Sequence, residues 1–181
     1  CNVHGYVINE GEKSPIPGKL VFRGYDIKDL VENAVKENRF AYEETVYLLL
    51  MGNLPTHEEL AAFTELMDEN RQLPPNFFED MILKAPSRNI MNKMGRALLS
   101  LYSYDENPEN RSPEFEMATA ISIISKLPNI MVSAYQVKRR VYDGQSMIMH
   151  PLIKGQSTAE MILSALRPDR KFTDEEAKLL D

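Results

Sequence analysis

The sequence predicts an all-α, multihelical protein with a short β-hairpin-like segment at its N-terminus. Helix start and stop signals recur along residues 26–181, while β-branched and aromatic residues mark short strands within residues 1–25. A single helical pattern also extends over residues 112–142. We therefore expect an N-terminal β segment, residues 1–25, followed by a helical part, residues 26–181.

The composition is that of an ordinary globular protein. The chain has 181 residues, of which 43% are hydrophobic and 27% charged, enough for one domain or part of a larger one. A net charge of −6 disfavours a general nucleic-acid surface. Cys1 is the single cysteine, so we expect no internal disulfide and no cysteine metal site, in keeping with a reducing cytoplasm. No signal or transit sequence is recognisable, and the expected localisation is cytoplasmic.

The β segment is expected to be a hairpin-like ribbon. Val3, Tyr6 and Ile8 favour a weak strand, and residues 20–22 a stronger one. Residues 11–18 contain two glycines and two prolines, which predicts a turn-rich connection between the strands.

Local capping signals place most of the helices. Asp26 and Ser87 are candidate N-caps, and Gly52 is a natural residue for ending a helix. Capping boxes occur at Thr56/Glu59, Ser157/Glu160 and Thr173/Glu176. Together these signals predict helices over about 27–37, 40–51, 57–71, 76–84, 88–103, 112–142 and 158–167, with another one opening after Thr173.

The longest predicted helix, residues 112–142, is apolar in almost every direction. Ser112 is a good N-cap, Pro113 suits the first helical position, and Lys126 is the only charge between residues 117 and 137. Its polar residues form one narrow stripe: Thr119, Ser122, Lys126, Asn129, Ser133, Gln136 and Arg140. We expect this helix to be covered nearly all round and to kink at Pro128. The interruptions by Lys126 and Pro128 disfavour a membrane span.

The residues alone indicate no catalytic or metal site. His4, His57 and His150 have no metal-ligand spacing, and the sequence has neither a glycine-rich phosphate loop nor a nucleophile elbow. Residues 43–44 and 174–176 are interpreted as acidic first turns of helices. Residues 138–140, Lys-Arg-Arg, are interpreted as a cationic last turn of the long helix, with phosphate binding as the alternative.

Three segments nevertheless resemble a known family. Residues 20–27 are Leu-Val-Phe-Arg-Gly-Tyr-Asp-Ile, and residues 42–56 contain Glu-Glu-Thr-Val-Tyr-Leu-Leu-Leu-Met-Gly-Asn-Leu-Pro-Thr. Residues 126–128, Lys-Leu-Pro, follow within the long helix. In order and separation these segments resemble citrate synthases, most closely the bacterial type, over about residues 18–181.

The resemblance implies an enzyme of the tricarboxylic acid cycle that condenses acetyl-CoA with oxaloacetate to give citrate and CoA. It implies a fold with a large and a small domain, and a homodimer formed through helices of about 88–103 and 112–142. Acetyl-CoA would be a substrate, and no cofactor would be bound permanently. The alternatives are a 2-methylcitrate synthase, which uses propionyl-CoA, and a non-enzymatic helical dimerisation domain.

The catalytic groups of that family lie beyond the position that matches Asp181. The resemblance therefore implies the N-terminal part of the large domain, inactive alone and serving as a dimerisation scaffold. A start at Cys1 rather than Met, and a last helix that has barely begun at Asp181, also suggest a fragment. Arg111 is the one candidate contact: some family members place an arginine in this loop near a CoA phosphate of the neighbouring subunit. The alternative for Arg111 is a solvated loop residue.

Overall fold

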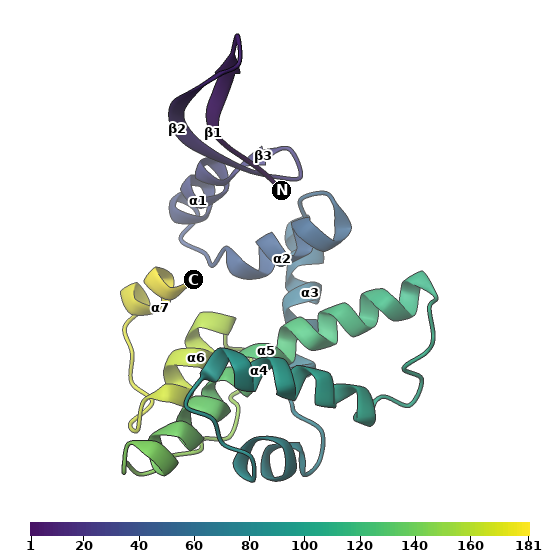
Figure 1. The fold of residues 1–181 in the computed structure, drawn as a ribbon, viewed down its shortest axis with the longest axis vertical. Coiled ribbons are helices and arrows are strands. Elements are labelled where there is room, and N and C mark those ends of the chain that lie inside the picture. Colours follow the sequence, from purple (N-terminus) through teal and green to yellow (C-terminus); the bar gives the residue numbers. More distant parts are fainter. The chain divides into compact units, whose positions relative to one another are not determined.

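A computed structural model describes residues 1–181 and confirms a mainly helical chain with a short N-terminal antiparallel sheet (Figure 1). The chain divides into two compact units, Cys1–Phe63 with Asp181, and Thr64–Leu180. The boundary between them falls within helix α3 (His57–Glu69). The grouping of residues 26–181 in one large domain stays a prediction.

The sheet has three strands in the order β1-β2-β3, namely β1 (Asn2–Asn9), β2 (Glu12–Phe22) and β3 (Tyr25–Asp26). Both pairings are antiparallel. Glu10 and Gly11 form the tight turn of the hairpin, with φ angles of 51° and 88°. Positive φ at both central residues is typical of the two-residue turns that match the twist of paired strands.

The turn-rich connection expected over residues 11–18 is wrong, because most of that stretch belongs to β2. Pro15 lies in the strand opposite Tyr6. Prolines are tolerated there because the second edge of β2 is paired with β3 only at Val21 and Phe22, so no ladder partner is lost.

The first unit contains helices α1 (Ile27–Lys36) and α2 (Tyr42–Met51) and the start of α3. The Asp26 carboxylate accepts a hydrogen bond from the Lys28 N–H at 3.0 Å, which confirms the predicted N-cap. Gly52 ends α2 in the left-handed conformation, with φ of 91°. The buried apolar side chains of this unit are Leu30, Ala34, Val46, Leu48 and Phe63.

All three predicted capping boxes are formed, opening α3, α6 (Thr158–Leu166) and α7 (Asp174–Leu180). In each box the Ser or Thr hydroxyl accepts a hydrogen bond from the backbone N–H of the glutamate three residues later. The carboxylate of that glutamate accepts a hydrogen bond from the backbone N–H of the Ser or Thr. These bonds are local, so the sequence spacing is sufficient to predict them.

The region between α3 and the long helix differs from expectation in two places. The short helix expected near residues 76–84 is η1 (Phe78–Leu83), a π-helix rather than an α-helix. Helix α4 (Ile90–Ser100) is capped by Asn89, whose side chain accepts the Asn92 N–H at 2.9 Å. The Ser87 hydroxyl accepts the Asn89 N–H instead, which uses Ser87 in the turn before the helix. A 3₁₀ turn, η2 (Leu101–Tyr104), extends α4.

The long helix is α5 (Pro113–Tyr142), and Ser112 caps it by accepting the Phe115 N–H at 3.4 Å. The helix is assigned without a break through Pro128, and the kink there stays a prediction. By length and composition α5 could cross a membrane, but core helices meet the same criterion. Here α5 supplies Ile130, Ala134 and Val137 to the core.

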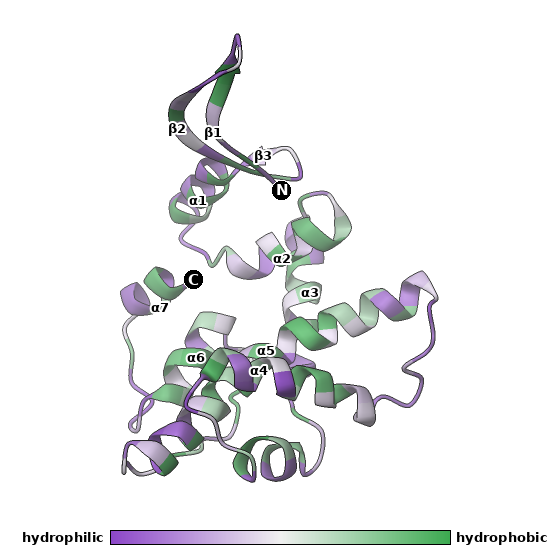
Figure 2. Cartoon of the chain, viewed as in Figure 1, coloured by the Kyte–Doolittle hydropathy of each residue, from purple (hydrophilic) through white to green (hydrophobic).

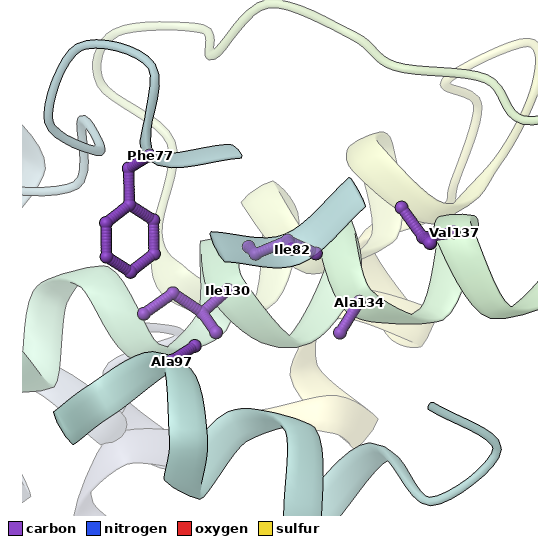
Figure 3. Close-up of a cluster of buried hydrophobic side chains, with 6 residues drawn as sticks. All are labelled: Phe77, Ile82, Ala97, Ile130, Ala134 and Val137. Carbon is purple, nitrogen blue, oxygen red and sulfur yellow. The ribbon is translucent and has the colours of Figure 1, made fainter. Parts of the chain in front are cut away.

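The core of the second unit forms where η1 and α4 pack against α5 (Figure 3). The ring of Phe77 lies edge-on to Tyr104 at a centroid distance of 5.3 Å. The fully buried members of this cluster are Phe77, Ile82, Ala97, Ile130, Ala134 and Val137.

Candidate functional site

The three histidines lie in separate places and form no common site. His4 is exposed on β1, and His57 is exposed in the first turn of α3. His150 is half-buried, with its Nε2 3.0 Å from the carbonyl oxygen of Arg167. No group of three or more His, Cys, Asp or Glu side chains that could hold a metal ion is present.

Arg111 lies in the loop that joins η2 to α5. Its side chain is 71% exposed, and its Nη2 is 3.7 Å from the Glu109 carboxylate. The Tyr102 hydroxyl donates to the same carboxylate, and this hydrogen bond raises the pKa of Tyr102. Arg111 is thus exposed enough to meet a phosphate, but it is already paired with Glu109, and the acidic residues of its own loop, Asp105, Glu106 and Glu109, oppose an anion there. Its role at CoA stays a prediction.

A buried polar network centres on Arg71, which is 1% exposed. Its guanidinium donates to Asp68 at 3.0 Å, to the Gln156 carbonyl oxygen, and to the Thr158 hydroxyl at 3.3 Å. The Asn129 side chain donates to the Arg71 carbonyl oxygen at 3.1 Å. The network therefore ties the end of α3 to the middle of α5 and to the start of α6.

The sequence analysis missed this network. Arg71 follows a predicted helix and precedes a Leu-Pro-Pro break, a position where an arginine is usually an exposed cation. Its partner Gln156 is 85 residues away, so no spacing signal connects them. The only hint is Asn129, one member of the narrow polar stripe on a helix that is apolar in its other directions.

The polar stripe of α5 joins this helix to α6. Gln136, 1% exposed, donates from Nε2 to the carbonyl oxygens of Ala165 and Leu166 at 3.3 and 3.4 Å. Those carbonyls lie in the last turn of α6, where backbone oxygens have no partner within the helix. Desolvation lowers the pKa of Lys126, which is half-buried and donates to the Ser122 hydroxyl.

One face of α4 and η2 presents an unusual row of apolar side chains to solvent. Met91 is 76% exposed, Leu99 78% and Tyr102 56%, and exposed Gly95 lies between the first two. Spacings of four, four and three residues place all four positions on one side of the helix. We call this row the α4 stripe. Figure 2 shows hydrophobic residues alternating with hydrophilic ones along α4. Such an exposed apolar row is typical of an interaction surface.

The comparison with protein families decides the assignment. A family model described as "Citrate synthase, C-terminal domain" matches residues 3–181. The chain belongs to the citrate synthase family. The resemblance found in residues 20–27, 42–56 and 126–128 is thereby confirmed.

Named relatives include citrate synthases and 2-methylcitrate synthases. Citrate synthase from Saccharolobus solfataricus is 33% identical over 71% of this chain and 31% of its own length. 2-Methylcitrate synthase 1 from Corynebacterium glutamicum is 30% identical over 70% of this chain and 31% of its own length. The chain thus spans about a third of the length of the citrate synthases it matches.

Solved structures show that the fold is that of citrate synthases. The crystal structure of citrate synthase from Pyrobaculum aerophilum superposes with a TM-score of 0.71 at 23% identity, over 88% of this chain and 39% of that chain. Citrate synthase from Thermoplasma acidophilum, in a ternary complex with carboxymethyl coenzyme A and oxaloacetate, has a TM-score of 0.68 over the same shares.

Proposed function

We propose that this chain is the scaffold part of a citrate synthase of the tricarboxylic acid cycle, acting in the cytoplasm. The whole enzyme would condense acetyl-CoA with oxaloacetate and release citrate and CoA, without a permanently bound cofactor. The match of the family model to residues 3–181 is the observation that supports this most. The chain itself would contribute structure rather than chemistry, as the N-terminal part of the large domain.

The positions of the titratable groups support an inactive chain. Acyl condensation needs a base to remove a proton from the acetyl group and donors to stabilise the developing negative charge. The histidines of this chain are scattered, and Arg71 is buried among structural partners. We expect no release of CoA thiol from acetyl-CoA and oxaloacetate by residues 1–181, measured with a thiol reagent beside an intact citrate synthase. Release above the enzyme-free rate would disprove this.

We further propose that the chain forms homodimers through α4 and α5. The α4 stripe supports this, because Met91 and Leu99 leave large apolar areas in water and Gly95 allows a second helix to approach closely. Sedimentation equilibrium should show a dimer, and Leu99→Asp should convert it to monomer.

Leu179→Asp is the matched control, since Leu179 is 88% exposed on α7, outside the proposed interface. It should leave the dimer intact. A wild-type chain that stays monomeric at all concentrations, or equal effects of the two substitutions, would contradict the proposed interface.

Relatives named 2-methylcitrate synthase support a second candidate activity. One from Shewanella oneidensis is 47% identical, over 55 residues. An assay of the whole enzyme with acetyl-CoA and propionyl-CoA in parallel separates the two candidates: a higher kcat/KM for propionyl-CoA would favour the methylcitrate reaction.

For Arg111 we propose contact with a CoA phosphate in the neighbouring subunit. Its 71% exposure leaves the guanidinium available to an anion. In the whole enzyme Arg111→Ala should raise KM for acetyl-CoA several-fold with kcat unchanged, while Lys171→Ala, also an exposed cation, should not. An unchanged KM in the Arg111 variant would identify a solvated loop residue.

A further inference from the structure

The second unit contains an open hollow of about 570 Å³ where α4, α5 and α6 meet. Its walls are mostly apolar and include Ile90, Met131, Val132, Tyr135 and Leu166. This volume lies within the range of small-molecule sites, about 300–1,000 Å³. The hollow is distinct from the α4 stripe, since none of the four stripe residues lines it.

A single positive charge lies among these walls, on Arg139. The Arg139 Nε donates to the Gln145 side-chain oxygen at 2.6 Å, and its guanidinium carbon lies 5.9 Å from the centre of the Tyr135 ring. Both partners are neutral. The nearby carboxylate of Asp143 accepts instead from Lys138, at 2.7 Å. Arg139 is therefore a cation without a carboxylate partner, in a chain whose net charge is −6.

We propose that this hollow binds a free medium-chain carboxylate, with its hydrocarbon tail against the apolar walls and its carboxylate on Arg139. Burial of each methylene of the tail removes apolar surface from water, and this gain needs apolar walls such as those of the hollow. A guanidinium pairs with a carboxylate through two parallel N–H donors, which the neutral Gln145 cannot match. The sequence analysis kept phosphate binding as an alternative for residues 138–140. Of these three residues Arg139 lines the hollow, and we assign it to the carboxylate of an amphipathic anion.

The sign of the charge and the apolar walls make separate demands on the ligand. A tail with a cationic head would meet Arg139 and be repelled, and a short anion such as acetate would gain nothing from the walls. The proposal does not depend on the catalytic assignment, because no substrate or catalytic group of a citrate synthase enters it.

The test is calorimetric titration of residues 1–181 with three probes: decanoate, decyltrimethylammonium and acetate, each below its micelle-forming concentration. Methyl NMR spectra record which side chains respond. Decanoate should bind once per chain, shift the methyl signals of Met131, Val132 and Leu166, and bind about tenfold more tightly than the cationic probe. Acetate should not bind measurably.

Two variants test separately the binding of the carboxylate by Arg139 and the binding of the hydrocarbon tail by the apolar walls. Arg139→Gln should weaken decanoate binding about tenfold and abolish the preference over the cationic probe, whereas the exposed control Lys171→Gln should change neither. Leu166→Trp should weaken decanoate by filling the hollow, with circular dichroism used to check that the variant is folded.

Several results would overturn the proposal. Equal affinity for the two decyl probes, or full binding by Arg139→Gln, would mean that the charge is not used. Shifts confined to Met91 and Leu99 would place the amphiphile on the α4 stripe. Decanoate binding that weakens as the protein concentration rises would show that a second copy of the chain occupies the hollow.

Discussion

Arg71 and Thr158 are in hydrogen-bond contact although 87 residues separate them, with Nη2 of the arginine 3.3 Å from Oγ1 of the threonine. The same guanidinium is paired with Asp68, which in turn accepts the Gly155 N–H at 2.9 Å. A charged side chain that is 1% exposed must be fully paired to be tolerated. The pairing therefore fixes the segment before α6 against the end of α3.

Replacing Arg71 with Met should lower the free energy of unfolding by about 3–5 kcal/mol, because it leaves the largely buried Asp68 carboxylate without its positively charged partner. Urea denaturation followed by circular dichroism measures this. The control Lys171→Met removes an exposed cation and should change the value by less than about 0.5 kcal/mol. A loss below about 1 kcal/mol for Arg71→Met would show that the network is dispensable.

Ile130 is 0% exposed at the centre of the second-unit core, so Ile130→Ala should cost about 2–5 kcal/mol of unfolding free energy. The matched substitution Ile153→Ala, at a position 40% exposed, should cost about 1 kcal/mol or less. Denaturant midpoints of the two variants give the comparison. Equal losses would place Ile130 outside the core.

Glu176 should make stability depend on acid pH. Its hydrogen bonds from Arg167, and then from the Thr173 N–H, lower the pKa of this carboxyl from 4.5 to about 2. The stabilising contribution is therefore complete above pH 4.5 and is lost as the pH falls from there through about 2. Thermal melts should show that Glu176→Gln is less stable than wild type at neutral pH. Near pH 2 the two proteins should be equally stable.

The exposed loop substitution Glu106→Gln serves as the control for this comparison. It should follow the wild-type melting temperature across the same acid range. If the Glu176→Gln deficit persisted unchanged at the lowest pH, the carboxylate would not be its source.

Lys93 should make stability depend on alkaline pH, again with stability rising as the pH rises. Its side chain is buried and donates to the Met81 carbonyl oxygen, and desolvation lowers its pKa from 10.5. Between the lowered pKa and 10.5 the unfolded chain binds more protons, so wild-type stability gains from this residue as the pH rises.

Lys93→Met keeps the length of the side chain and removes the titrating group. Relative to this variant, the wild-type free energy of unfolding should rise as the pH is increased toward 10.5. Chemical denaturation of both proteins at several alkaline pH values measures the difference. A difference that does not change with pH would mean that Lys93 is not desolvated.

The sequence was most successful where the determining contacts are local. The capping boxes at Thr56, Ser157 and Thr173 each join residues three positions apart, and all are formed. Prediction from the sequence failed where the secondary structure of a segment depends on pairing with another segment. Pro15 and Pro17 indicated a loop, yet β1 pairs with that segment and makes it a strand.

By itself the sequence determined the helical fold class, the extent of most helices and the family, because each depends on short-range hydrogen bonds or on short strings of residues. The tertiary structure alone decided which polar side chains are buried and which apolar ones remain in water. Arg71 is covered because its partners converge from distant segments, and Leu99 is exposed because no element of this chain packs on its side of α4. Burial depends on the packing of whole elements, and spacing along the chain does not encode it.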